Sequence, residues 1–204
     1  ILADDMGLGK TVQAIAHILT EKNAGRLTAP ALVVAPTSVV HNWQHELARF
    51  APQLKVLMLH GAERSGRFDE LAHSDVVISS YPLLPRDIEI LEKQPFHLAI
   101  FDEAQYLKNA RTRASEAATK LRVTHRMALS GTPVENNLSE LWSLFHVLLP
   151  GFLGDSRRFT QLYRTPIEKQ GNVQRQPHLA RRIKPFILRR TKDTVAQALP
   201  PKTE

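Results

Sequence analysis

Short apolar runs alternate with longer amphipathic stretches along the first 150 residues of the chain. The short runs end at polar or turn residues, which is typical of strands buried in a parallel sheet. The longer stretches repeat apolar residues at helical spacing. This alternation predicts an α/β fold in which helices cover both faces of a parallel sheet. We expect strands at residues 31–35, 54–59, 75–79, 97–101 and 125–129, and helices at 11–23, 39–50, 83–92, 110–121 and 138–148.

The helix predicted over residues 39–50 has one apolar face. Val39, Trp43, Leu47 and Phe50 recur at helical spacing along it. This spacing favours a core position for Trp43 over a role as a platform on which bases stack.

Strong turn residues at Pro150 and Gly151 divide the chain into two regions. Residues 1–150 are predicted to form the α/β lobe, and residues 151–204 a small helical extension. Within the extension we expect helices near 156–163 and 178–184, and a polar loop over 170–177.

Residues 4–11, Asp-Asp-Met-Gly-Leu-Gly-Lys-Thr, have the composition of a phosphate-binding loop. Two glycines allow a tight turn whose N–H groups point at phosphates, and a lysine and a threonine follow to reach the outer phosphates and a magnesium ion. The helix that comes next would direct its positive end at the same phosphates. One position departs from the usual pattern, because Asp4 stands where glycine is usual. The alternative is a glycine-rich turn that only caps a helix. The predicted nucleotide-binding residues are Gly7, Leu8, Gly9, Lys10, Thr11, Val12 and Asp102.

A second acidic motif, Asp102-Glu103-Ala104-Gln105, follows the apolar run at 96–101. Carboxylates at the carboxyl end of such a strand lie beside the phosphate loop in a doubly wound sheet. We predict that Asp102 holds magnesium together with Thr11, and that Glu103 orients and deprotonates the attacking water. The alternative is an ordinary aspartate cap on the next helix. The predicted catalytic residues are Lys10, Asp102 and Glu103, and the predicted cofactors are ATP and Mg²⁺.

Two further loops follow predicted strands and are rich in hydroxyl groups. Thr37 and Ser38 follow the first strand, and Ser80 and Tyr81 follow the third. Hydroxyls and a helix N-terminus suit a DNA phosphate at Thr37 and Ser38. Helix capping by serine or threonine is the alternative, and capping and phosphate binding are compatible. The segment Ser130-Gly131-Thr132-Pro133, taken alone, is typical of a turn.

Composition excludes several classes of protein. The 43% hydrophobic content is that of a globular chain, and 204 residues suffice for one good core. There is no cysteine, so disulfides and thiolate metal sites are excluded, and the nine histidines show no metal-ligand spacing. No apolar run is long enough to cross a bilayer, and no signal peptide is visible. We therefore expect an intracellular protein without a membrane partner, in the cytoplasm or nucleoid of a bacterium or the nucleus of a eukaryote.

The positive charge is concentrated near the C-terminus. Residues 1–150 carry 15 Lys and Arg against 16 Asp and Glu, whereas residues 151–204 carry 12 against 4. The excess suits an anionic surface such as a phosphate backbone. A solvated helical face is the alternative.

Several motifs in a fixed order resemble the SWI/SNF family of DNA-dependent ATPases, in helicase superfamily two. The resemblance covers essentially the whole chain, and its last motifs are specific to this family rather than to helicases at large. The motifs are Gly7-Leu8-Gly9-Lys10-Thr11, Ala35-Pro36-Thr37-Ser38 with Asn42-Trp43 and Glu46, Asp102-Glu103-Ala104-Gln105, Ser130-Gly131-Thr132-Pro133-Val134-Glu135-Asn136-Asn137, Phe186-Ile187-Leu188-Arg189-Arg190-Thr191-Lys192 and Leu199-Pro200-Pro201-Lys202.

The resemblance implies a phosphate-loop, RecA-like ATP-binding lobe that takes part in ATP-driven translocation along double-stranded DNA without strand separation. It implies as partners double-stranded DNA, a second RecA-like lobe of the same polypeptide, and a DNA-bound protein complex that is remodelled. The residues expected to couple hydrolysis to the DNA groove are Gln105, Ser130, Gly131 and Thr132. Those expected to bind DNA are Thr37, Ser38, Ser80, Tyr81, Arg189, Arg190 and Lys192.

Family members continue upstream of Ile1 with the segment that contacts adenine, and beyond Glu204 into the second lobe. The second lobe supplies the arginine fingers, so the resemblance implies that residues 1–204 alone are nearly inactive. Two alternatives remain open. One is a strand-separating DNA or RNA helicase of the same superfamily. The other is a non-catalytic DNA-binding or protein-binding module with a decayed nucleotide site, against which stands the presence of Lys10, Thr11, Asp102 and Glu103.

Overall fold

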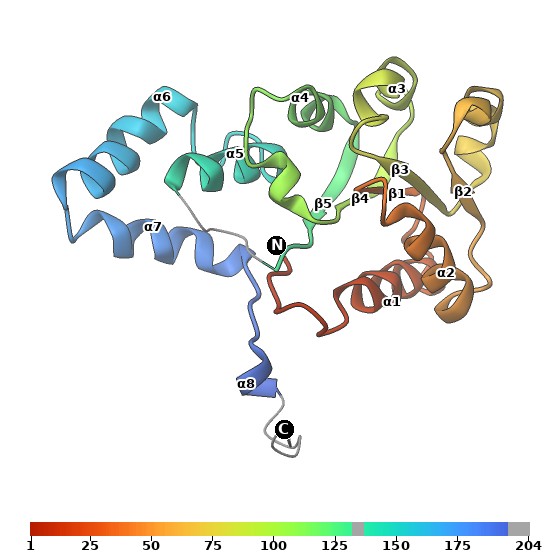
Figure 1. Cartoon of the computed structure of the whole chain (residues 1–204), viewed down its shortest axis with the longest axis horizontal. Coiled ribbons are helices and arrows are strands. Elements are labelled where there is room, and N and C mark those ends of the chain that lie inside the picture. Colours follow the sequence, from red (N-terminus) through yellow and green to blue (C-terminus); the bar gives the residue numbers. More distant parts are fainter. Residues whose placement is uncertain (132–136, 196–204) are drawn as a thin grey trace.

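The computed structural model of the chain describes residues 1–131 and 137–195, which are built around one parallel sheet (Figure 1). Five strands lie in the order β2-β3-β1-β4-β5, and all pairings between them are parallel. The predicted parallel α/β fold is therefore confirmed. The strands are β1 (Ala31–Ala35), β2 (Val56–Met58), β3 (Val76–Ser80), β4 (Phe96–Phe101) and β5 (Val123–Ala128).

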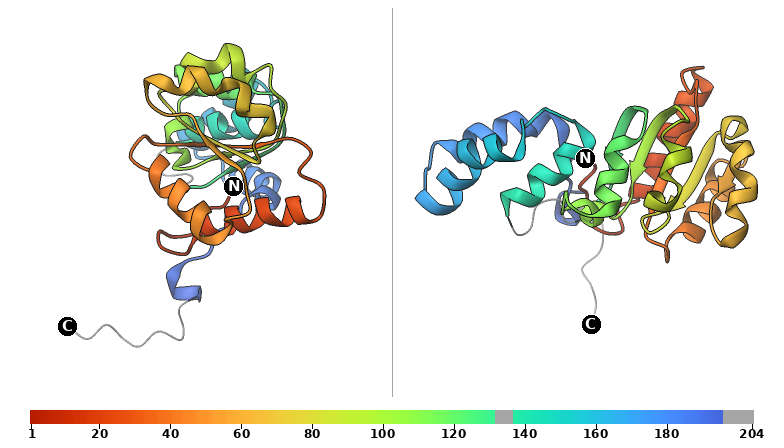
Figure 2. Two further views of the ribbon diagram at one scale, coloured as in Figure 1. Left: turned by 90° about the vertical axis from the view of Figure 1, so that its right-hand side faces the viewer. Right: turned by 90° about the horizontal axis from the view of Figure 1, so that it is seen from above.

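Helices cover both faces of the sheet, as Figures 1 and 2 show. Helices α1 (Lys10–Asn23) and α2 (Val40–Phe50) pack on one face. Helices α3 (Leu84–Leu91), α4 (Arg113–Lys120) and α5 (Leu138–Leu148) pack on the other. Every residue of β1, β3 and β4 is consequently buried, which explains their continuous apolar character.

The element boundaries agree with the sequence predictions to within a few residues. Two differences stand out. Helix α4 begins at Arg113 rather than at residue 110, because the Thr112 hydroxyl accepts a bond from Ser115 N and caps the helix there. Two 3-10 segments, η1 (Ala62–His73) and η2 (Ala104–Leu107), occupy stretches to which the periodicity assigned no element.

Arg126 on β5 ties two helices to the edge of the sheet. Its guanidinium donates to Ala118 O and Val147 O, both at 2.8 Å, and to Leu121 O at 2.7 Å. These carbonyls lie at the ends of α4 and α5, where a cation is favoured. Burial lowers the pKa of Arg126.

The C-terminal extension begins with three helical segments. Helix α6 (Ser156–Phe159) continues into the π-helix η3 (Thr160–Lys169), and α7 (Arg175–Ile183) packs back against η3. The expected loop over 170–177 is therefore shorter than predicted. Pro177 lies in the first turn of α7, where the missing N–H costs no helical bond. Side chains from α5, α6, η3 and α7 share one apolar cluster, which includes Phe145, Phe159, Tyr163 and Leu179.

After α7, the short turn η4 (Lys184–Phe186) leads the chain past its own N-terminus and into α8 (Lys192–Val195) (Figure 1). Leu2 forms parallel bridges both to Leu129, just after β5, and to Leu188. The first residues of the chain thus lie between the sheet and the returning C-terminal segment. Across the described residues, the helices are too short or too polar for a membrane-spanning role.

Candidate nucleotide-binding site

The glycine-rich loop has the backbone that phosphate binding requires. Gly7 and Gly9 have φ angles of 87° and 76°, in the left-handed region that glycine adopts without strain. Helix α1 starts directly after Gly9, so its free N–H groups open onto the loop. The Lys10 ammonium donates to Asp4 O at 2.7 Å and to Asp5 O at 3.2 Å, which holds it beneath the loop.

One cavity of about 400 Å³ brings this loop together with the acidic motif after β4. Lys10 and Thr11 line it from one side, and Asp102 and Glu103 from the other. Gly7, Gly9 and Val12 line the same cavity, so the structure brings these predicted nucleotide-binding residues together. Leu8 is not among the lining residues, and its carbonyl accepts a bond from the Gln13 amide at 3.0 Å.

Asp102 is held by neutral hydrogen-bond donors. The Trp43 indole Nε1 donates to Asp102 Oδ2 at 2.8 Å, and Glu103 N donates to Oδ1 at 2.9 Å. The Tyr81 hydroxyl donates to the Asp102 carbonyl at 2.8 Å. Burial raises the pKa of Asp102, against the lowering effect of these donors. The core position predicted for Trp43 is confirmed, but nothing in the sequence indicates its bond to Asp102.

Glu103 occupies a strained backbone position. Its φ of 47° is left-handed, which is uncommon for a residue other than glycine and is frequent at functional sites. The Gln105 amide donates to Glu103 Oε2 at 2.7 Å, and the Ser130 hydroxyl donates to Gln105 Oε1 at 3.4 Å. A chain of side-chain bonds therefore joins the candidate base to the segment after β5. Gly131 lies next in that segment, close to Met6, whereas Thr132 is outside the described residues.

The oxygen atoms available near Lys10 fit a magnesium ion carried by a nucleotide. The Thr11 hydroxyl and the Asp102 carboxylate line one cavity, and both are hard oxygen donors of the kind magnesium prefers. Within residues 1–131 and 137–195 no three His, Asp or Glu side chains cluster as a metal site. Two protein ligands match magnesium better than a self-contained protein cage, since this ion keeps several waters and phosphate oxygens.

A second cavity of about 400 Å³ lies at the same edge of the sheet, past the ends of β1, β2 and β3. Thr37, His60, Ser80 and Arg86 are among its lining residues. Thr37 and Arg86 are exposed. Ser80 Oγ and His60 Nδ1 are buried and have no hydrogen-bond partner in the described part of the chain. Arg64 also lines the cavity, but both carboxylate oxygens of Asp87 pair with its guanidinium.

Two of the predicted DNA-binding residues serve other contacts in this structure. Tyr81 is 2% exposed and its hydroxyl is bonded to Asp102 O, so its side chain does not face a DNA surface. The Arg190 guanidinium bonds to Asp4 and Gln13, beside the phosphate loop. Both placements depend on the tertiary structure. The DNA contacts of the exposed Ser38, Arg189 and Lys192 stay predictions, as does that of Ser80.

The parallel sheet, the glycine-rich loop before α1 and the two carboxylates after β4 together define a phosphate-loop nucleotide-binding lobe. Residues 1–204 match the SNF2-related domain family, and the chain belongs to that family. The predicted SWI/SNF resemblance is thereby confirmed.

Solved structures and relatives agree with this assignment. The Sulfolobus solfataricus SWI2/SNF2 ATPase core, solved in complex with double-stranded DNA, is 41% identical, with a TM-score of 0.89 over 98% of this chain and 42% of that one. The Bacillus subtilis protein YwqA, whose name describes an ATP-dependent helicase/translocase, is 48% identical over 100% of this chain and 23% of its own length. The Schizosaccharomyces pombe TATA-binding protein-associated factor mot1 is 38% identical over 99% of this chain and 12% of its own. The chain therefore spans less than half the length of each of these relatives.

Two substitutions separate nucleotide binding from hydrolysis, measured in the full-length polypeptide. Lys10→Ala removes a charged donor from the cavity, and we expect ATP binding to weaken by about tenfold to a hundredfold. Glu103→Gln leaves Asp102 in place, so binding should persist while the hydrolysis rate falls by about 10²–10⁴.

Calorimetric titration with ATP and a phosphate-release assay measure the two effects. Glu89→Gln, at an exposed carboxylate on α3, is the matched control and should leave both unchanged. A wild-type rate of hydrolysis in Glu103→Gln would show that another group acts as the base.

Proposed function

We propose that this chain is the ATP-binding lobe of an ATP-driven translocase that moves along double-stranded DNA without separating its strands. The observation that carries the proposal is the single cavity shared by Lys10, Thr11, Asp102 and Glu103. A decayed nucleotide site in a mere binding module would not retain all four groups in one place. The DNA-bound structure of the Sulfolobus relative supports the choice of DNA as the polymer.

These four residues of the cavity each have a role in the proposed phosphoryl transfer. Lys10 and the N–H groups of the loop bind the phosphates, and Thr11 and Asp102 hold magnesium. The ion supplies neutralisation of phosphate charge when it is bound. Glu103 orients the attacking water and accepts its proton, and the Gln105 amide at 2.7 Å fixes the direction of that carboxylate.

Two buried aromatic residues connect the predicted DNA-facing loops to the nucleotide cavity. Trp43 lies on α2, which follows Thr37, and Tyr81 directly follows Ser80. The Trp43 indole donates a hydrogen bond to the Asp102 carboxylate, and the Tyr81 hydroxyl donates one to the Asp102 carbonyl. A DNA phosphate that shifts either loop would therefore move Asp102. Together with the bonds from Glu103 through Gln105 to Ser130, this forms the proposed coupling between DNA and hydrolysis.

Tyr81→Phe tests this coupling because it removes only the hydroxyl. We expect the affinity for ATP to stay within about twofold and the DNA-stimulated hydrolysis rate to fall by about tenfold, the value of one lost hydrogen bond. Tyr106→Phe is the matched control, since Tyr106 is exposed and stacks on Tyr81 with ring centroids 4.9 Å apart. Equal rates in the two variants would remove Tyr81 from the coupling.

The complete active site is proposed to need a second lobe of the same polypeptide. Arginine fingers contribute about 10³–10⁵ to the rate of phosphoryl transfer, and the resemblance places them on that lobe. We expect residues 1–204 alone to bind ATP weakly and to hydrolyse it barely above background, while DNA stimulates the full-length protein. Steady-state ATPase assays of the two proteins, with and without duplex DNA, check this. A fragment as fast as the full-length protein would contradict it.

The relative mot1 is described as a TATA-binding protein-associated factor. We therefore propose that this translocase acts on a DNA-bound protein complex. The corresponding location is the cytoplasm or nucleoid of a bacterium or the nucleus of a eukaryote. A duplex-unwinding assay distinguishes the translocase from the strand-separating helicase, because a translocase displaces a third strand or a bound protein while the two strands of the duplex stay paired.

DNA binding should depend steeply on salt and little on sequence, because phosphate contacts release counterions without reading bases. We expect Arg86→Ala and Arg189→Ala each to reduce the slope of log K against log salt by about 1. Arg49→Ala is the control, since Arg49 lies in the last turn of α2, far from the carboxyl ends of the strands. Fluorescence anisotropy across a salt series measures the slopes. Unchanged slopes in both variants would mean that these charges are only solvated.

A further inference from the structure

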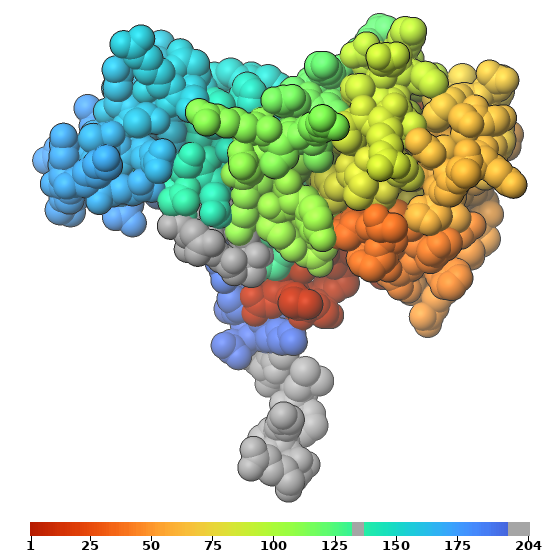
Figure 3. Space-filling model, turned by 45° about the horizontal axis from the view of Figure 1, so that its top comes forward, coloured from red at the N-terminus to blue at the C-terminus, as the bar shows by residue number. Residues whose placement is uncertain are grey.

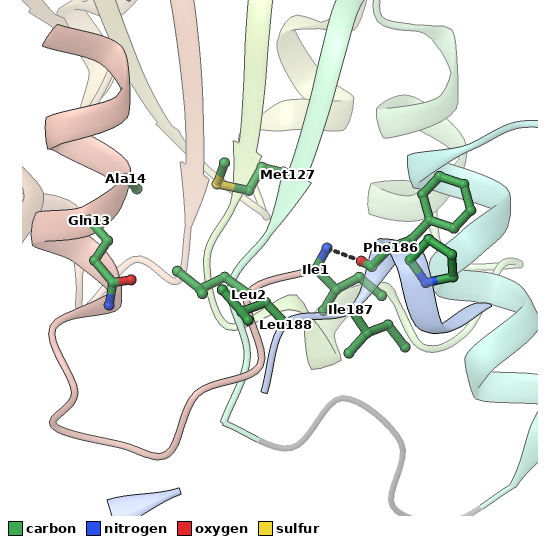
Figure 4. A pocket seen from close by; sticks show the side chains of 9 residues that line it. Ile1, Leu2, Gln13, Ala14, Met127, Phe186, Ile187 and Leu188 are labelled. Atoms are coloured by element: carbon green, nitrogen blue, oxygen red, sulfur yellow. Dashed lines mark hydrogen bonds between the residues drawn. The ribbon is translucent and has the colours of Figure 1, made fainter. Parts of the chain in front are cut away.

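A segment from the far end of the chain pairs with the residues that lead into the phosphate loop. Leu188 N donates to Ile1 O at 2.9 Å, Ala3 N to Leu188 O at 2.7 Å, and Asp5 N to Arg190 O at 3.1 Å. Figure 4 shows Leu2 and Leu188 side by side, with the Ile1 amino group bonded to Phe186 O. We call residues 187–192 the return segment. It pairs through backbone hydrogen bonds with the first residues of the chain, next to the phosphate loop.

The return segment is joined to the loop by an ion pair between the partly exposed Arg190 and the buried Asp4. Asp4 is 0% exposed, and Arg190 donates to it from its backbone N at 2.9 Å and from its guanidinium, which reaches both carboxylate oxygens. Arg190 Nη2 also bonds to Gln13 on α1. One guanidinium therefore contacts the chain on both sides of residues 5–9, at Asp4 before them and at Gln13 of α1 after them.

Asp4 and the adjacent Asp5 also hold Lys10, the lysine predicted to bind phosphate. Lys10 Nζ bonds to the carbonyls of Asp4 and Asp5, while their side chains bond to Arg190 and to Lys192 N, the latter at 3.0 Å. A Cβ placed on Gly7 would lie 3.9 Å from Lys192 Nζ, so the return segment also lies against the loop itself. Figure 3 shows this proximity at the surface, where the first residues of the chain meet the C-terminal segment.

The pair explains why an aspartate occupies a position where phosphate loops usually carry glycine. A buried carboxylate is costly unless it is paired, and removing one partner of such a pair leaves an uncompensated charge. Burial raises the pKa of Asp4, but the bonds from Arg190 outweigh it and hold the pKa below its ordinary value. Glycine at this position could not anchor the return segment.

We propose that Arg190 is a positioning residue of the nucleotide site, which holds Asp4 and thereby the main chain on which Lys10 rests. The conformation of the return segment then sets the affinity of the lobe for ATP. This inference rests on the proposed function of the cavity as an ATP site. It assigns Arg190 to ATP rather than to DNA.

The test uses the full-length polypeptide without DNA. Arg190→Lys keeps the charge but loses the planar fork that spans Asp4 and Gln13, and we expect KM for ATP to rise by about tenfold with kcat changed by less than about threefold. Arg181→Lys, the same exchange at an exposed arginine on α7, is the matched control and should match the wild type. Circular dichroism verifies that each variant is folded.

A double-mutant cycle tests whether Arg190 acts through Asp4. Asp4→Asn and Arg190→Gln should each weaken ATP binding, and the double variant should bind no more weakly than the worse single variant, because both changes break one contact. Additive losses, or an unchanged KM in Arg190→Lys, would overturn the inference. Failure of the wild-type protein to bind ATP would instead refute the proposed function, so the two failures are distinguishable. Arg190→Lys alone decides the matter if Asp4→Asn does not fold.

Discussion

The common direction of the five strands is the constraint on which the site depends. Parallel strands all end at one edge of the sheet, and the polypeptide leaves each strand there before a helix returns it to the other edge. Thr37, Asp102 and Ser130 follow three different strands, yet all three lie along this edge. The phosphate loop opens onto the same edge, because α1 packs beneath the sheet with its N-terminus pointing that way.

Two buried carboxylates at this edge have different roles because their hydrogen-bond partners differ. Asp4 and Asp102 are both buried, but Arg190 neutralises Asp4, whereas Asp102 accepts bonds from the neutral Trp43 indole and a backbone N–H. Neutral donors fix the direction of a carboxylate without cancelling its charge. Asp102 is therefore placed to pair with a cation that enters the cavity, whereas Asp4 is already paired with Arg190 and helps to hold the backbone in place.

The C-terminal extension packs closely against the α/β lobe. Its helices share an apolar cluster with α5, and the return segment pairs with the first residues of the chain. The nucleotide loop is thus bounded on one side by the sheet and on the other by a segment that follows the whole extension. A movement of the extension relative to the sheet would reach Asp4 and Lys10 through main-chain and ion-pair contacts. This arrangement offers a direct mechanical route between the C-terminal extension and the phosphate loop.

The amino-acid sequence by itself determined the five strands and the helices α1 to α5, the glycine-rich loop, the acidic motif and the buried position of Trp43. These features depend on short-range periodicity and on backbone preferences of a few neighbouring residues. The tertiary structure alone decided that Tyr81 is buried against Asp102 and that Arg190 pairs with Asp4, a residue 186 positions away. Such contacts follow from the strand order β2-β3-β1-β4-β5 and from the return of the C-terminal segment to the N-terminus. Local sequence patterns predict neither the strand order nor the return of the C-terminal segment, because each depends on how whole elements pack against one another.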